Sequence, residues 1–224
     1  VLEAARELGT PRVVHTSTSE VYGTARTVPI AESHPLQAQS PYSASKVAAD
    51  KLAESYHLSF ELPVVTLRPF NTYGPRQSAR AVIPTIVSQL AAGERRVRLG
   101  ALDPTRDFTF VTDTVAAFLA VGRAPVGSVV GRVLNAGSGE EISVGDLVRL
   151  IAEVMGEEVE VVQDEARMRP DASEVRRLVC DSSALRAATG WRPCVPLRQG
   201  LGVTAAWFLE PGNLARYKTT VYNV

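Results

Sequence analysis

The feature that most constrains the fold is the alternation of short apolar runs with longer segments of helical periodicity. Three runs have the composition of buried parallel strands, residues 12–16, 62–67 and 132–135, and a further strand is expected at 159–162. Segments typical of helices lie around these runs, at residues 1–9, 41–60, 81–92, 112–121, 143–155 and 182–189. Strands that alternate with helices in this way favour an α/β fold built on a parallel sheet.

Individual residues mark where some of these elements begin and end. Pro41 lies just inside the start of its helix, where a fixed φ suits the first turn, and Ser143 is the expected N-cap of the helix that follows it. The stretches 17–40 and 68–78 lack a regular period and are expected to be loops. Pro, Gly and Asn at 211–213 indicate a loosely held tail.

Composition narrows the classes of partner. The 224 residues are 45% hydrophobic, enough to bury a core, and 24 basic side chains balance 24 acidic ones. A formal charge of zero gives no general attraction to nucleic acid or anionic lipid, and no apolar run approaches the ~20 residues of a membrane span. We therefore expect a small-molecule substrate, with neither a nucleic acid nor a membrane as partner.

The two cysteines, Cys180 and Cys194, have no metal-ligand spacing, and one isolated pair makes a poor disulfide framework. This usage predicts no metal site and makes a reducing cytoplasm the default location. Both thiols are expected to be buried as small hydrophobic groups.

Tyr42 and Lys46 lie four residues apart on a predicted helix and therefore share one face. A phenol is a poor base at neutral pH, but a neighbouring ammonium and a cationic nicotinamide ring favour the phenolate form. Tyr42 could then accept a proton from a sugar hydroxyl while the carbon beneath it loses hydride. The pattern alone is more often an ordinary surface pair, so its surroundings must decide.

Polar segments follow two of the predicted strands. Residues 16–20, Thr-Ser-Thr-Ser-Glu, come after the first strand, and residues 68–75, rich in Pro, Asn and Gly, come after the second. Such hydroxyls and turn residues can simply cap and shape the backbone. However, the carboxyl ends of parallel strands are where open α/β sheets hold their ligands, so we expect these segments to converge with the Tyr42 helix on one crevice.

Taken together, the motifs resemble those of the extended short-chain dehydrogenase/reductases of the nucleotide-sugar epimerase/dehydratase family. The matching segments are 17–23, 40–46, 68–75, 106–113 and 135–139. The resemblance covers essentially the whole chain and implies a Rossmann-type parallel sheet with a smaller α/β substrate-binding lobe. Residues 1–125 are then the remainder of an NAD-binding domain, interleaved with the substrate lobe, and residues 126–224 are mainly the sugar-nucleotide-binding lobe and tail.

The resemblance also implies roles for single residues. Thr18 hydrogen-bonds the reacting sugar oxygen, Tyr42 is the base, and Lys46 supports Tyr42 and holds the nicotinamide ribose. Glu20 and Ser19 complete the catalytic set, with Ser19 at a position where many dehydratases have Asp. The cofactor-binding residues are Tyr42, Lys46, Pro69 and Phe70, and the residues expected to face the nucleotide diphosphate are Asn71, Arg106, Asn135 and Arg169. His15, in a strand, is expected to be a satisfied buried histidine outside the site.

One departure from the family pattern stands out, because no G-x-x-G-x-x-G occurs in this chain. Family members begin with a strand and a Gly-rich turn onto a helix that binds the pyrophosphate of NAD. Roughly 100 residues, about one nucleotide-binding half, are therefore expected ahead of Val1. The intact protein is expected to bind NAD and to form a homodimer through helices 1–9 and 41–60.

Glu20 bears on the reaction. A 4-epimerase needs only the hydroxyl and Tyr-Lys chemistry, whereas a 4,6-dehydratase also needs a carboxylate that removes the carbon-5 proton. The Thr-Ser-Glu triplet also resembles nucleotide-glucuronate decarboxylases, but residues 106–109, Arg-Asp-Phe-Thr, look more like dehydratases and epimerases. Residues 77–84 most resemble enzymes that act on UDP-N-acetylglucosamine. A non-catalytic cofactor-sensing or interaction module is the alternative of another class, and the complete acid/base set argues against it.

Overall fold

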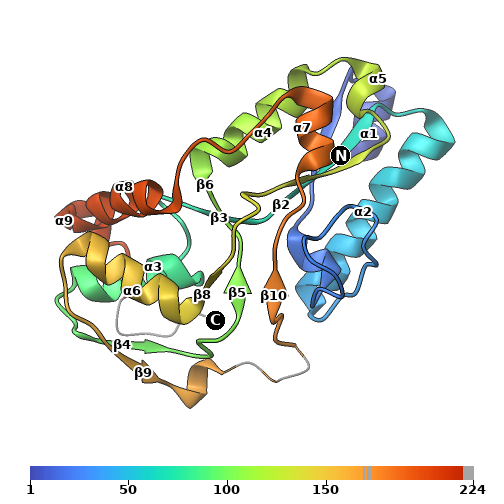
Figure 1. Cartoon of the computed structure of the whole chain (residues 1–224). Helices are drawn as coiled ribbons and strands as arrows, with labels where there is room; N and C mark the ends of the chain where they lie inside the picture. Colours follow the sequence, from blue (N-terminus) through green and yellow to red (C-terminus); the bar gives the residue numbers. More distant parts are fainter. Residues whose placement is uncertain (169, 171–172, 219–224) are drawn as a thin grey trace.

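The computed structural model describes residues 1–168, 170 and 173–218. Its first sheet is parallel, with the order β1 (Val13–Thr16), β2 (Val64–Pro69) and β7 (Val133–Ala136). The helices that surround this sheet are α1 (Leu2–Glu7), α2 (Pro41–Phe60), α4 (Val111–Arg123), α5 (Val126–Val129) and α7 (Ser183–Thr189). The α/β class expected from the sequence is confirmed (Figure 1).

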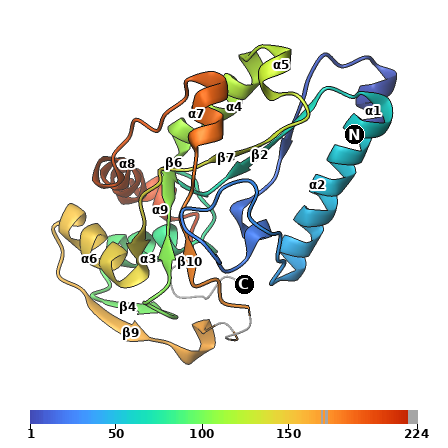
Figure 2. The ribbon, with the colours of Figure 1, turned by 45° about the vertical axis from the view of Figure 1, so that its right-hand side comes forward.

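The central strand β2 explains why helices cover both faces of the sheet. Successive strand side chains point to opposite faces, and β2 is buried on both of them. Val65 and Leu67 belong to a core that contains buried residues of α4, α5 and α7, whereas Val64 packs with Ala53 of α2 and the apolar side of α1. Figure 2 shows α2 on one side of β2 and β7, with α4 and α7 on the other.

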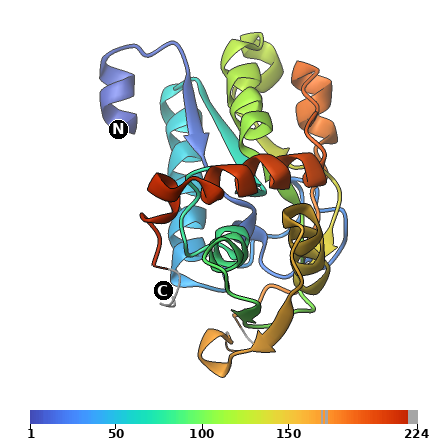
Figure 3. The same cartoon turned by 90° about the vertical axis from the view of Figure 1, so that its left-hand side faces the viewer.

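A second lobe forms around helices α3 (Val82–Ala91), α6 (Val144–Met155) and α8 (Leu197–Leu209), which meet in the largest core cluster (Figure 3). Its short strands pair as β3 (Asn71–Tyr73) with β6 (Phe108–Phe110), β4 (Arg96–Leu99) with β9 (Glu160–Gln163), and β5 (Thr105–Arg106) with both β8 (Ile142–Ser143) and β10 (Arg177–Leu178). Short helical pieces complete the chain: the 3₁₀ turns η1 (Ser19–Tyr22) and η2 (Glu165–Arg167), and α9 (Pro211–Leu214).

The two cores are interleaved along the chain. α3 and β4 lie before residue 125 yet belong to the second lobe, while β7 and α7 lie after it yet pack in the first core. A boundary near residue 125 therefore divides the sequence but does not separate the lobes in space.

Helix α8 is absent from the sequence-based expectations because it contains two glycines and has no side-chain N-cap. One of those glycines is required by packing. A Cβ at Gly200 would lie 2.1 Å from the hydroxyl of Tyr73, so α8 can approach β3 this closely only with glycine at that position. The helix buries Leu201, Ala205 and Phe208 in the second core.

Two further expectations are corrected by the structure. The chain beyond α8 is not loose up to residue 217, since the Tyr217 ring lies 4.6 Å from that of Phe208 and its hydroxyl donates to Gln77 O at 2.8 Å. Cys180 is buried as expected, but Cys194 is exposed because its segment runs over the surface, where its amide donates to Asp113. In the described part of the chain, no helix has the combination of length and apolar character needed to cross a membrane.

Asp107 joins the segments that meet between the two cores. Its fully buried carboxylate accepts hydrogen bonds from the amides of Ser138 (2.8 Å), Gly139 (2.8 Å) and Cys180 (3.0 Å), and from the Ser138 hydroxyl (2.6 Å). Burial raises the pKa of Asp107, and these hydrogen bonds oppose that rise by favouring the ionised form. Cys180 also forms an isolated β-bridge with Ile30. The Asp107 side chain thus ties the loop after β7 and this bridge to strands β5 and β6.

Replacement of Asp107 by alanine should lower the free energy of unfolding by about 3 kcal/mol, because buried amides lose their acceptor at about 1–3 kcal/mol each. Urea denaturation measures the change. Asp103→Ala removes an exposed carboxylate four residues earlier and is the matched control, with an expected effect within about 0.5 kcal/mol. Equal, small effects of both variants would contradict the structural role of Asp107.

Candidate functional site

A cavity of about 720 Å³ lies between the carboxyl end of the first sheet and the second lobe. Glu20 of η1 and Tyr42 of α2 line it from the sheet side. The opposite side is lined by residues of three segments, 71–85, 99–108 and 167–178, together with Val144. The volume lies in the range of small-molecule sites. The part of the chain after residue 156 therefore supplies only some of the residues of this second wall.

Four of the expected site residues line this cavity: Glu20, Tyr42, Asn71 and Arg106. Tyr42 lies in the first turn of α2, a helix capped by the Ser40 hydroxyl, and its side chain is 51% exposed. Glu20 lies in η1. Asn71 begins β3, and its side-chain Nδ2 donates to the backbone oxygen of Asp107 at 3.2 Å. The structure thus brings the Tyr42 phenol of α2 and the Glu20 carboxylate, which follows β1, to the same cavity.

The cationic side of the cavity is formed by arginines. Arg106 of β5 forms an ion pair with Glu174 at 3.0 Å and donates to Thr105 O. Arg80 and Arg167 also line the cavity, and Arg167 contacts Asp164 at 3.3 Å. Planar guanidinium groups suit bidentate contacts to phosphate oxygens. This side of the cavity therefore carries donors of the kind that phosphate oxygens accept, next to the carboxylate of Glu174.

The sequence reasoning missed Arg80 and Arg167. Arg80 falls in residues 77–84, which were noted only for their likeness to one substrate class, and Arg167 lies two residues before the arginine that was chosen instead. That residue, Arg169, lies outside the described residues.

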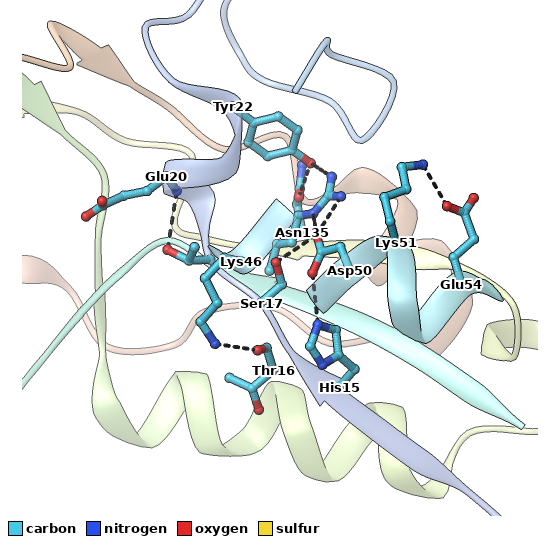
Figure 4. Close-up of polar contacts among 12 residues, drawn as sticks. His15, Thr16, Ser17, Glu20, Tyr22, Lys46, Asp50, Lys51, Glu54 and Asn135 are labelled. Atoms are coloured by element: carbon cyan, nitrogen blue, oxygen red, sulfur yellow. Dashed lines mark hydrogen bonds and ion pairs between the residues drawn. The ribbon is translucent and has the colours of Figure 1, made fainter. Parts of the chain in front are cut away.

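Thr18, Lys46 and Ser19 flank the cavity rather than line it among the described residues. Lys46 Nζ donates to the carbonyl oxygen of Thr16 at 3.0 Å, at the end of β1 (Figure 4). The Thr18 hydroxyl accepts from the amide of Glu20 at 3.3 Å and so caps η1. Ser19 is buried, which removes it from direct contact with a ligand in this cavity.

The proposed cofactor-side residues, Pro69 and Phe70, lie where β2 ends. Phe70 donates its amide to Ala136 O at 2.8 Å, and its ring is buried against that of Tyr22, with a centroid separation of 6.4 Å. The Phe70 ring therefore packs inside the protein, and the cofactor-binding role expected of this segment stays a prediction that concerns its backbone. Pro69 is half-buried at the same strand end.

The structure does not bring Asn135 to the cavity. Its side chain is 0% exposed, because Oδ1 accepts from the Tyr22 hydroxyl at 2.7 Å and Nδ2 donates to Ile30 O at 3.1 Å. Both ends of the amide are thus used inside the protein, and Asn135 leaves the set of candidate substrate-binding residues.

Asp50 of α2 is a buried carboxylate close to the site but outside the cavity. It accepts hydrogen bonds from His15, Ser17 and Arg68 (Figure 4). Burial raises the pKa of Asp50, but the hydrogen bonds from His15 and Ser17 and the charge of Arg68 outweigh it and hold the pKa below its usual value. His15, expected to be a satisfied histidine outside the site, has this role.

Comparison with known proteins matches residues 1–204 to the family model described as GDP-mannose 4,6 dehydratase. A dTDP-glucose 4,6-dehydratase of Streptomyces griseus is 38% identical, over 93% of this chain and 62% of that protein. A UDP-glucose 4-epimerase of Mycolicibacterium smegmatis is 36% identical, over 92% and 65%.

Among solved structures, a dTDP-glucose 4,6-dehydratase of Bacillus anthracis in complex with NAD superposes with a TM-score of 0.82 at 31% identity, over 94% of this chain and 65% of that one. The matches confirm the family resemblance and the Rossmann-type fold inferred from the motifs. The chain spans 62% and 65% of the lengths of the two curated relatives.

The lowered pKa of Asp50 has a measurable consequence for stability. The folded protein keeps the Asp50 carboxylate ionised below its ordinary pKa of about 3.9. Its contribution to the free energy of unfolding is therefore fully present above that pH and is lost as the pH falls through the lower pKa of the folded state. Asp50→Asn should therefore destabilise by about 3 kcal/mol at pH 5, since Arg68 loses its buried partner, and by less at pH 3.

Urea unfolding at pH 5 and pH 3 measures both values, in a range where histidine is protonated in the unfolded chain. Glu54→Gln on the exposed side of α2 is the control and should show little effect at either pH. A destabilisation by Asp50→Asn that is the same at both pH values would contradict the ionised, paired state of Asp50.

Proposed function

Because this chain belongs to the GDP-mannose 4,6 dehydratase family, we propose that it is the catalytic and substrate-binding part of an NAD-dependent enzyme that dehydrates a nucleoside-diphosphate sugar. The observation that carries this proposal is that Glu20 and Tyr42 line one cavity together with arginines suited to a diphosphate. A 4,6-dehydration needs two proton acceptors near one sugar, and these two side chains supply them.

Tyr42 is the proposed base for the 4-hydroxyl. Its half-exposed phenol, on the first turn of α2, can approach a ligand in the cavity. Lys46, one turn further along the same helix, places its ammonium at the end of β1, where it donates to Thr16 O at 3.0 Å. Thr18, at the start of η1, has a hydroxyl that can hydrogen-bond the same sugar oxygen.

Glu20 is the proposed base for the carbon-5 proton, which becomes acidic once carbon 4 is a ketone. The elimination breaks the carbon-5 C–H bond and the bond from carbon 6 to its hydroxyl, which leaves as water. With Ser19 buried, the second proton also falls to Glu20, which can return the proton that it has taken to the departing hydroxyl. Glu20 thus acts first as base and then as acid.

The residues at the strand ends fit the nicotinamide end of NAD. Lys46 donates one hydrogen bond to Thr16 O and carries further N–H donors for ribose hydroxyls, and the backbone at Pro69 and Phe70 lies at the next strand end. When bound, NAD would accept hydride from the sugar and return it. The relative of known structure from Bacillus anthracis is described in complex with NAD.

The identity of the sugar nucleotide is proposed at the level of its class. The names of the relatives include a dTDP-glucose dehydratase, a UDP-glucose epimerase and a GDP-deoxymannose reductase, so the diphosphate sugar is the shared element. UDP-N-acetylglucosamine is the candidate that residues 77–84 suggest. A panel of UDP-, dTDP- and GDP-sugars with the complete protein would test it.

A 4-epimerase is the second candidate function. The buried position of Ser19 favours it, because the Ser19 hydroxyl is then not placed to assist the loss of water. Epimerisation would require Tyr42, Lys46 and Thr18 but not Glu20, and the similar Mycolicibacterium protein carries an epimerase name.

The substitution Glu20→Gln separates the two candidates. In the full-length enzyme it should lower dehydration about 10²- to 10⁴-fold while oxidation at carbon 4 persists, so NADH and a 4-keto sugar that keeps its 6-hydroxyl should accumulate. Tyr42→Phe should abolish both steps. NADH absorbance and mass spectrometry of the sugar nucleotide follow them, and Glu54→Gln, which removes an exposed carboxylate further along α2, is the control. Full activity of Glu20→Gln with a product of unchanged mass would establish the epimerase instead.

We also propose that the complete protein is a homodimer through the outer face of α2. Leu52 is 54% exposed there, and the small residues Ala44 and Ala48 lie exposed on the same helix, which allows close packing of a second helix. Light scattering at micromolar concentration should give twice the monomer mass. Leu52→Glu should give monomers, whereas Leu209→Glu, equally exposed on α8, should not; a monomeric wild type would contradict the proposal.

A further inference from the structure

Asp50 is an unusual residue for the buried side of α2. Apart from Ser43 and Ala53 it is the only side chain of α2 that is buried, and it is 4% exposed. An ionised carboxylate in such a place is costly unless it is paired and hydrogen-bonded. Asp50 also lies four residues after Lys46 and eight after Tyr42, so all three project from neighbouring parts of one helix face.

The partners of Asp50 come from both strands that α2 covers. Its Oδ1 accepts from His15 Nε2 at 2.9 Å, and its Oδ2 accepts from the Ser17 hydroxyl at 2.9 Å and from Arg68 Nε and Nη2 at 3.1 and 2.9 Å. His15 belongs to β1, Ser17 follows it, and Arg68 is near the end of β2. One carboxylate therefore fixes α2 to the ends of two strands (Figure 4).

Arg68 extends this contact to the turn that carries Glu20. Its Nη1 donates to the Tyr22 hydroxyl at 2.8 Å, and its guanidinium lies 4.9 Å from the centroid of the Tyr22 ring. The Tyr22 hydroxyl in turn donates to Asn135 on β7. Because Tyr22 ends η1 and Glu20 lies within it, the helix of Tyr42 and the turn of Glu20 are held by one continuous set of buried hydrogen bonds.

We propose that Asp50 is a positioning residue, which acts through Arg68 and Tyr22 to hold Tyr42, Lys46 and Glu20 in a fixed relation across the cavity. The inference rests on the proposed function of these three side chains. Along the helix axis Asp50 is about 6 Å from Lys46 and about 12 Å from Tyr42, so a small slide or rotation of α2 at Asp50 is passed on to both. Displacements of about 1 Å at a catalytic group can cost about 10²-fold in rate.

An alternative is that Asp50 contributes only to global stability. Buried ion pairs often stabilise no more than an apolar pair of similar volume, so stability is weak grounds for this arrangement. The two roles differ in what they affect: positioning concerns the first turns of α2 and η1, whereas a purely global contribution concerns all protected amides alike.

The first test needs no enzymatic activity. Hydrogen–deuterium exchange of the 224-residue chain should show faster exchange in residues 42–46 and 19–22 for Asp50→Asn, by a factor at least ten-fold larger than the increase that global destabilisation causes in the second core. Glu54→Gln, which removes an exposed carboxylate one turn further along α2, should leave both segments unchanged. Unchanged exchange at 42–46 and 19–22 in Asp50→Asn, or a uniform increase throughout the chain, would overturn the proposal.

If Asp50→Asn does not fold, because Arg68 is left buried and unpaired, the double variant Asp50→Asn with Arg68→Gln removes both charges and takes its place. The same two segments should exchange faster in the double variant, since an amide pair cannot accept from His15, Ser17 and residue 68 together. Exchange equal to that of the wild type would overturn the proposal.

The second test uses the full-length enzyme with its sugar nucleotide and NAD. Asp50→Asn, or the double variant, should lower kcat about 10²-fold with KM within about two-fold, because the arginines and Asn71 that line the substrate cavity are untouched. Glu54→Gln should keep both constants. A folded Asp50 variant with an unchanged kcat would overturn the positioning role. Inactivity of the wild type towards all nucleotide sugars would instead refute the proposed function, and the exchange experiment would still decide whether Asp50 orders α2 and η1.

Discussion

The buried carboxylate of Asp50 is the interaction on which the geometry of the site depends. Apolar packing alone fixes α2 poorly, because Ala53 is the only apolar side chain of that helix that is fully buried. The hydrogen bonds from His15, Ser17 and Arg68 to Asp50 are directional. They therefore fix both the rotation of α2 about its axis and its position along the sheet, which apolar contacts alone do not. Tyr42 and Lys46 inherit their positions from that anchor.

A second buried carboxylate, that of Asp107, holds the backbone of the opposite wall of the cavity in place. Asp107, beside Arg106, accepts hydrogen bonds from three backbone amides, two in the loop after β7 and one at Cys180, and so holds the end of β5, which carries Arg106, at that wall. Neither carboxylate lines the cavity. The acids that hold the site and the acid proposed to react in it, Glu20, are thus different residues with different surroundings, the first two buried and the last in contact with the cavity.

The sequence predicted the parts of the fold that depend on local pattern. The strands at 13–16 and 64–69 and the helix from Pro41 follow from apolar periodicity and end signals. Glu20, Tyr42, Asn71 and Arg106, which the motifs single out, line one cavity. Tertiary contacts set the rest. Gly200 weakens the helical sequence pattern of α8, but only glycine leaves room there for the Tyr73 hydroxyl. The motif around Asn135 indicates a ligand contact, whereas the structure shows its side-chain amide hydrogen-bonded to Tyr22 and Ile30.

The central claim is that Glu20 removes a proton from carbon 5 of the sugar that Tyr42 has deprotonated at its 4-hydroxyl. Turnover by the full-length protein in D₂O tests it most directly, because a proton taken from carbon 5 by a side chain is replaced from the solvent. NMR and mass spectrometry of the product should show one deuterium at carbon 5 together with the loss of one water. A product of unchanged composition, with protium retained at carbon 5, would contradict the claim.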